Sequence, residues 1–174
     1  MNRLIISAVF ASLVPFTSLA GEQFIDETTF AVSGYDVVEY FMLEQSPLGV
    51  PQLAGVPGLA NITAEYNGAT FAFSSEENRD VFLVDPAAYV PQYDGHCAYG
   101  VAQGGKVPGN PNLWRIVDGE LFLNITEAVA GFWEVDISGN LQQSQINWTT
   151  IESMPASTRT IPQFTSAAPL TNGG

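Results

Sequence analysis

The chain has 174 residues, with 18 acidic residues against five lysines and arginines, and its formal net charge is −13 at pH 7. A surface this acidic repels nucleic acid and anionic lipid, which argues against both as partners. The single cysteine excludes an intramolecular disulfide, a CxxC redox pair, a CxxCH haem-attachment site and a four-cysteine zinc ribbon.

The first 20 residues have the pattern of a secretory signal peptide. Arg3 precedes an almost wholly apolar run over residues 4–19, and Ser18-Leu19-Ala20 places small residues where a signal peptidase reads them. We therefore expect cleavage after Ala20 and a periplasmic or secreted mature protein. An uncleaved anchor is disfavoured because the run is barely long enough to span a bilayer and contains Pro15. No later segment has the length and hydropathy of a membrane span.

The rest of the chain is long enough for one domain with a core of its own. We assign residues 21–151 to this domain. Residues 152–174 are rich in proline, serine, threonine and glycine, a composition that predicts a disordered tail. No internal repeat is expected from the sequence.

The first half of the domain contains a clear hairpin signal. Residues 37–41 form a short apolar segment of strand or helical turn, and the Gly- and Pro-rich residues 47–60 predict an irregular surface loop. Segments 63–66 and 70–73 then flank Asn67-Gly68, the dipeptide favoured where a tight turn needs positive φ.

A helix and a second hairpin follow. Ser74-Ser75 precedes two glutamates and predicts a helix N-cap with acids in the first turn, and Asp85-Pro86 ends that helix. Segments 113–117 and 121–123 predict the second hairpin, around an Asp-Gly-Glu turn at 118–120.

The last predicted element is helical. Residues 127–141 indicate a helix that is interrupted near Ser138-Gly139, and residues 142–151 can continue it. The fold class is therefore α+β: a small single domain of two β-hairpins packed with two or three helices.

The chemically singular position is Cys97, the only cysteine, which follows the only histidine, His96. If Gly95 turns the chain so that a helix begins at Ala98, the thiol lies at a helix N-terminus and its pKa should fall below the usual ~8.5. A buried, inert cysteine is the commoner fate of a lone one. Nucleophilic acyl transfer is disfavoured, since the side chains of sequence neighbours rarely face each other.

Metal binding would depend on very few ligands. Besides Cys97 and His96, the soft candidates are Met42 and Met154. A blue-copper site needs two histidines with a cysteine, and structural zinc needs four ligands, so this chain alone supplies neither set. A sparse thiolate site favours Cu(I) over zinc, because two or three soft ligands satisfy Cu(I). We expect Cys97 as the main ligand, with smaller contributions from His96 and Met42.

A series of ordered motifs extends over residues 30–151: GYDVVEYF (34–41), AEYNGATF (64–71), FSSEENRD (73–80), PQY (91–93), CAYGVA (97–102), WRIVDG (114–119) and LFLN (121–124). Together they resemble the exported YHS-domain proteins. In some members of that family the residue that matches Cys97 is encoded as selenocysteine, and tyrosine is usual at the position of His96.

The resemblance implies a metal-handling module with a treble-clef-like centre. It also implies a functional Cys97, because selenium benefits a nucleophile or a soft-metal ligand. The leading hypothesis is an exported, non-enzymatic protein that binds a copper-type ion through Cys97. The alternatives are a redox protein in which Cys97 reacts with a small thiol or an oxidant, and a non-catalytic structural module.

Overall fold

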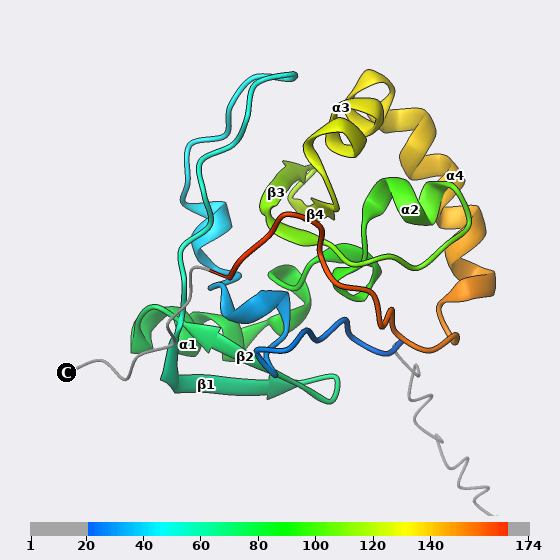
Figure 1. Cartoon of the computed structure of the whole chain (residues 1–174). Helices are drawn as coiled ribbons and strands as arrows, with labels where there is room; N and C mark the ends of the chain where they lie inside the picture. The colour runs from blue at the N-terminus through cyan, green and yellow to red at the C-terminus, as the bar shows by residue number, and fades with distance from the viewer. Residues whose placement is uncertain (1–20, 167–174) are drawn as a thin grey trace, which may run out of the picture.

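The computed structural model describes residues 21–166, while the expected signal peptide (1–20) and residues 167–174 lie outside the described residues (Figure 1). The described part is a small α+β domain with two antiparallel two-stranded sheets, as the sequence predicts, and with four α-helices where two or three were expected. The elements are η1 (Val32–Gly34), η2 (Glu39–Phe41), β1 (Leu59–Tyr66), β2 (Ala69–Phe73), α1 (Glu76–Val84), η3 (Pro86–Ala88), η4 (Gln92–Gly95), α2 (Ala98–Ala102), β3 (Asn110–Val117), β4 (Glu120–Asn124), α3 (Glu127–Val135) and α4 (Ile137–Ile151), where η denotes a 3-10 turn. None of the helices in residues 21–166 is long and apolar enough to cross a membrane.

Both predicted hairpins are confirmed. β1 pairs with β2 around Asn67-Gly68, whose φ angles are 48° and 74°, and β3 pairs with β4 around Asp118-Gly119, at 51° and 83°. Asparagine, aspartate and glycine enter this left-handed region at the lowest cost. Local sequence alone therefore determines both turns.

The helix that follows each hairpin is capped by a hydroxyl. Ser75 accepts a hydrogen bond from the backbone of Asn78 before α1, and Thr126 accepts one from Val129 before α3. The predicted interruption of the last helix lies slightly earlier than expected. α3 ends before Asp136, whose side chain accepts from the backbone N–H of Gly139 and so begins α4 as a separate helix.

The two hairpin–helix units repeat each other at a constant offset of 51 residues. The turn Asn67-Gly68 corresponds to Asp118-Gly119, and the cap Ser75 to Thr126. In both units the strand register also shifts at the same place, between Leu59 and Thr63 in β1 and between the matching residues of β3. The sequence carries the same repeat, since Val-Pro-Gly at 56–58 recurs at 107–109 and Val84-Asp85 recurs as Val135-Asp136, so the expectation of no internal repeat is wrong.

The repeat extends, at a larger offset of 61 residues, to the turn that precedes each hairpin. In η1 and η4 three successive residues have positive φ, and each run ends on a glycine, Gly34 or Gly95. Gly58 then donates a backbone hydrogen bond to Gly34 (2.8 Å), and Gly109 donates one to Gly95 (3.0 Å). Residues Tyr35-Asp36 in the first unit therefore occupy the place of His96-Cys97 in the second.

The apolar core joins the two units. Its larger part packs β2 and α1 against residues of β3 and β4, and its centre includes Phe73, Phe82 and Trp114. A smaller cluster of Ala98, Phe122 and Trp133 lies between β4, α2 and α3. Among the apolar side chains of α1 and α3, Phe82 and Trp133 are buried, whereas Val81, Val84 and Phe132 are exposed. 

The segment after α4 differs from the expectation of a disordered tail. Residues 152–166 follow the surface of the domain beside the N-terminal segment, as the blue and red traces of Figure 1 show. Ala156 donates a backbone hydrogen bond to Glu22 (3.0 Å), and Ile161 is buried. A few apolar and backbone contacts thus hold this segment on the domain, although its composition is polar on average.

Candidate functional site

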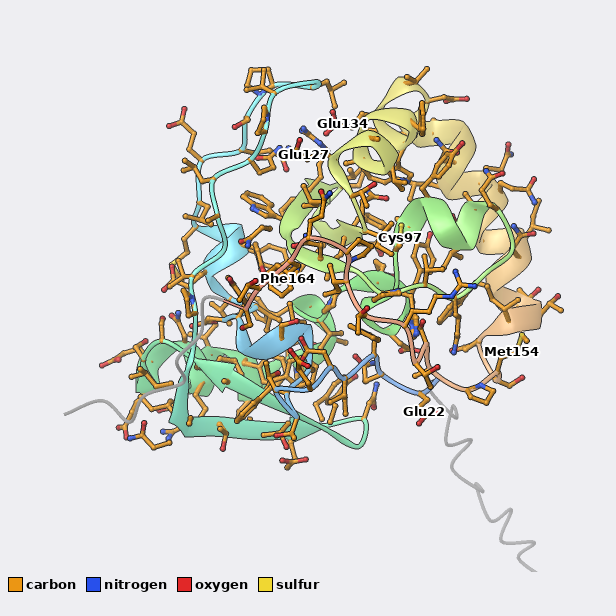
Figure 2. All side chains as sticks on the ribbon, viewed as in Figure 1. Glu22, Cys97, Glu127, Glu134, Met154 and Phe164 are labelled. Carbon is orange, nitrogen blue, oxygen red and sulfur yellow. The ribbon has the colours of Figure 1, made fainter. Side chains whose placement is uncertain are left out.

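Cys97 is the N-cap of α2 and is fully buried, with 0% of its surface exposed (Figure 2). The thiol donates a hydrogen bond to Oδ1 of Asn124 (3.4 Å), and its sulfur accepts one from the backbone N–H of Gly100 (3.3 Å). The predicted helix start at Ala98 is confirmed. As a neutral S–H group, the thiol therefore makes both hydrogen bonds, one as donor to Asn124 and one as acceptor from Gly100.

The expected low pKa of this thiol is wrong. Burial raises the pKa of Cys97 above its ordinary value, and the backbone N–H groups of Gly100, Ile125 and Tyr99 lower it by less. The reason is that α2 has only five residues, while the core excludes the water that would solvate a thiolate. The dipole of so short a helix does not offset this desolvation.

The internal repeat pairs Cys97 with an equivalent residue, Asp36, in the first unit. Its counterpart Asp36 is also 0% exposed, and the backbone N–H of each residue donates to a matching valine carbonyl, that of Val56 or Val107, at 2.8 Å. The Asp36 carboxylate accepts hydrogen bonds from Val38, Ser74 and Asn78, with donor–acceptor distances of 2.7–2.9 Å. In both units this position links the preceding turn to the end of the second strand, so a structural role of Cys97 accounts for its contacts.

His96 is equally buried, and both of its ring nitrogens are engaged. Nε2 lies 3.1 Å from the backbone N–H of Ser157 and accepts its hydrogen bond, so Nδ1 carries the proton and donates to the carbonyl of Tyr93 at 2.9 Å. Burial, the largest cause, lowers the pKa of His96 to about 4. The imidazole is therefore neutral at pH 7 and holds the C-terminal segment in place.

The structure does not bring the three predicted metal ligands together as a free ligand set. Met42 is 63% exposed and follows η2, whereas Cys97 and His96 are buried beside α2 with their polar atoms occupied. Residues 21–166 contain no group of three or more histidine, cysteine or acidic side chains placed to hold a metal ion. Binding of Cu(I) or zinc at Cys97 would first have to break the contacts with Asn124 and Gly100.

A charged cluster that the sequence analysis did not predict surrounds Asp94, which lies just before His96 and Cys97 in the chain. Gln23 donates to Oδ1 of Asp94 (2.8 Å), while Oδ2 is buried and has no hydrogen-bond partner within residues 21–166. Burial raises the pKa of Asp94 to about 6, against an opposing effect of Lys106. Lys106 itself donates to the carbonyls of Glu152 (2.8 Å) and Met154 (2.7 Å). The lone lysine of so acidic a chain was the available signal for this cluster.

A cavity of about 200 Å³ lies between β3, α3 and the loop that contains Gly49–Gln52. Its polar wall includes the buried ion pair of Arg115 with Glu134, 2.6 Å apart, and Glu134 also accepts from the backbone of Gly49. Arg115 additionally donates to the carbonyl of Ser46, so this pair attaches the loop to the domain.

The same cavity has one side chain with an unused hydrogen-bond donor. Trp133 lines the cavity as an aromatic wall, but its indole Nε1–H is buried without an acceptor in residues 21–166 and is not exposed at the cavity surface. Asn124 also lines it; Oδ1 of Asn124 accepts from Cys97 and Tyr99, and no bond of Nδ2 is present in the described part of the chain. Trp114 adds a second aromatic wall.

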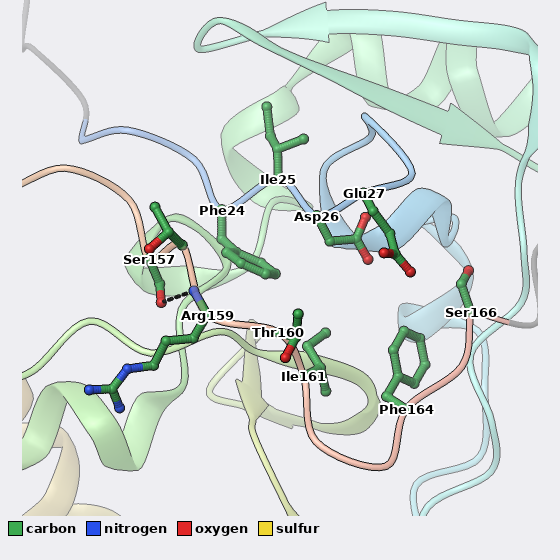
Figure 3. Close-up of a pocket in the computed structure, with 11 residues that line it drawn as sticks. Phe24, Ile25, Asp26, Glu27, Ser157, Arg159, Thr160, Ile161, Phe164 and Ser166 are labelled. Atoms are coloured by element: carbon green, nitrogen blue, oxygen red, sulfur yellow. Dashed lines mark hydrogen bonds between the residues drawn. The ribbon is translucent and has the colours of Figure 1, made fainter.

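A second cavity, of about 280 Å³, lies between the terminal segments and is drawn in Figure 3. Phe24, Ile161 and Phe164 form its apolar side, and Asp26 and Arg159 belong to its polar side. Asp26 already accepts hydrogen bonds from Thr28 and Ser33. Both carboxylate oxygens of Asp26 are therefore occupied. For this reason the cavity offers less specific chemistry to a ligand than the cavity at Trp133.

Comparison with known proteins gives no assignment. No family model matches the chain, and neither the curated proteins nor the solved structures contain a significant match. The resemblance to exported YHS-domain proteins therefore stays a prediction from the motifs.

Proposed function

We propose that this chain is a non-catalytic binding module that takes a small neutral molecule into the cavity beside Trp133, with Cys97 as a structural cap behind its wall. The observation that supports this is the unpaired Asn124 Nδ2–H donor in a cavity with aromatic walls from Trp114 and Trp133. Binding sites are typically apolar clefts with a few polar groups that fix orientation.

The chemistry of the walls defines the ligand class. An unpaired buried N–H group costs free energy, and a ligand oxygen that accepts its hydrogen bond recovers it. The strongly negative chain and the carboxylates of Glu127 and Glu134 at the cavity disfavour an anion. A cavity of about 200 Å³ suits a small apolar body. We therefore expect a carbonyl, hydroxyl or ether oxygen on a small ring or short chain.

The test uses cyclohexanone as the probe, with methylcyclohexane as the matched apolar control. Cyclohexanone should shift the side-chain amide resonances of Asn124, and Asn124→Val, which removes the donor, should weaken binding about 3- to 10-fold, the loss of one hydrogen bond. Equal binding of both probes, or of cyclohexanone to both proteins, would refute the role of the donor. If no resonance of the protein shifts at the solubility limit of cyclohexanone, the proposed site is refuted.

The thiol-centred hypothesis has one observation in its favour. Asn124 both lines the cavity and contacts the sulfur of Cys97, so a change in the Asn124 rotamer would connect the cavity to the thiol. A Cu(I) chelator competition should separate the two proposals, with wild type, Cys97→Ser and His96→Ala as the set. Equal affinity of wild type and Cys97→Ser would end the soft-metal proposal. Tight binding that is lost in Cys97→Ser would replace the structural reading of Cys97, and peroxide-dependent labelling without metal would favour the redox alternative.

A further inference from the structure

Gly21, the expected first residue of the mature protein, lies against the unpartnered oxygen of Asp94. A side-chain carbon built on Gly21 would lie only 2.1 Å from Asp94 Oδ2 and 2.8 Å from the carbonyl oxygen of Glu152. The Cα atom of Gly21 is one bond away from that position, so it lies within about 3.6 Å of Oδ2. The backbone nitrogen of Gly21 is bonded to this Cα atom and therefore lies within about 5 Å of Oδ2.

Neighbouring residues hold this end of the chain in place. Gln23 and Phe24 are buried; the Gln23 side chain donates to Asp94 Oδ1 and the Phe24 backbone N–H donates to the Asp94 carbonyl, both at 2.8 Å. Glu22 accepts a hydrogen bond from Ala156. Three successive residues therefore fix the direction in which Gly21 approaches Asp94.

We infer that the α-ammonium group of Gly21, released by cleavage after Ala20, forms an ion pair with Asp94 Oδ2 and completes the fold of the mature protein. The inference rests on the cleavage that the sequence predicts and is independent of the ligand proposal. Hydrolysis adds water across the Ala20–Gly21 peptide bond: the carbonyl carbon of Ala20 gains the hydroxyl and becomes a carboxylate, while the nitrogen of Gly21 gains the hydrogen and, at neutral pH, a further proton.

The uncleaved chain cannot make this pair, because its Gly21 nitrogen is an uncharged amide. Without the ammonium, Asp94 Oδ2 is a buried acceptor with no donor, and burial raises its pKa to about 6. The α-ammonium would supply the missing charge and donor, with the Glu152 carbonyl as a second acceptor. The charged groups around it are the carboxylates of Asp94, Glu22 and Glu152 and the ammonium of Lys106, so the local balance favours a cation.

The experiment compares the chain that begins at Gly21 with one that begins at Ala20. ¹⁵N NMR should place the α-amino pKa of the Gly21 chain about one unit above the usual range of about 7.7–8.0, and Asp94→Asn should return it to that range. The Gly21 chain should also melt about 3 °C above the Ala20 chain, a difference that Asp94→Asn removes. Asp85→Asn, at an exposed aspartate, is the matched control and should change neither value.

A second variant separates the contact from the length of the chain. Gly21→Ala keeps the free ammonium but places a methyl group where Asp94 Oδ2 and the Glu152 carbonyl lie, so its α-amino pKa should be ordinary. An ordinary α-amino pKa in the wild-type Gly21 chain would overturn the inference, whatever the melting temperatures. If Asp94→Asn fails to fold, the Gly21→Ala and wild-type pKa values decide the question by themselves.

Discussion

Acidification should destabilise this protein through His96, a group that the fold keeps neutral. Burial lowers the pKa of His96 to about 4 in the folded chain, against about 6.5 for an unfolded histidine. The unfolded chain therefore binds a proton first as the pH falls. Stability from this group is fully present above about pH 6.5 and is lost progressively as the pH falls toward about 4.

The geometry explains the direction of this effect. Protonation of Nε2 would turn the acceptor of the Ser157 N–H bond into a donor, and Nδ1 is already bonded to the Tyr93 carbonyl. From these two pKa values, acidification from about pH 7 to about pH 5 removes about 2 kcal/mol from the free energy of unfolding. Asp94 has the opposite sign, because its folded pKa is raised: its contribution is present below about pH 4 and is lost as the pH rises through about 6.

The assay is urea unfolding followed by tryptophan fluorescence, with Asp94→Asn present in every protein so that the opposing titration is absent. In this background the chain with His96 should lose about 2 kcal/mol between about pH 7 and about pH 5. The same chain with His96→Gln has no titrating imidazole and should lose far less. Equal losses in the two proteins would refute the reasoning, since the acid sensitivity would then arise elsewhere.

Three further predictions concern stability, each measured by urea unfolding at pH 7. Cys97→Ser, which keeps a donor and an acceptor at the cap of α2, should cost less than Cys97→Ala, which should lower the free energy of unfolding by about 1–2 kcal/mol; the reverse order would contradict the capping role. Glu134→Ala leaves the buried guanidinium of Arg115 unpaired and should cost about 3 kcal/mol, so a neutral result would show that this pair is not desolvated. Gly58→Ala should cost about 1–3 kcal/mol because its new carbon would lie 2.4 Å from the backbone of β2, whereas Gly131→Ala, in open space on α3, should be neutral or stabilising.

The sequence by itself determined the elements that depend on neighbouring residues. Asn67-Gly68 and the Asp-Gly pair at 118–119 specify tight turns because few residue types enter positive φ cheaply. Ser75 specifies the start of α1, and the turn at Gly95 specifies the helix start after Cys97. In each case the physical cause acts within about four residues, so the pattern is readable without the fold.

The repeat of the two hairpin–helix units is present in the sequence as well as in the backbone, but its central position is equivalent only in backbone geometry. Asp36 and Cys97 occupy the same place in their units, yet a carboxylate and a thiol share no sequence signature. One forms hydrogen bonds with Ser74 and Asn78, and the other with Asn124. The equivalence lies in φ angles and backbone bonds, which different side chains can support equally well.

The chemistry of His96 and Cys97 was decided only by tertiary structure. The adjacency of His96 and Cys97 suggested a reactive pair, but the nitrogen that could bind a ligand meets Ser157, which lies 61 residues further along the chain. The pKa of each group depends on how completely distant segments exclude water from it, and burial shifts both toward their neutral forms. Local sequence names the titratable groups, while the long-range packing that sets their solvation exists only in the folded chain.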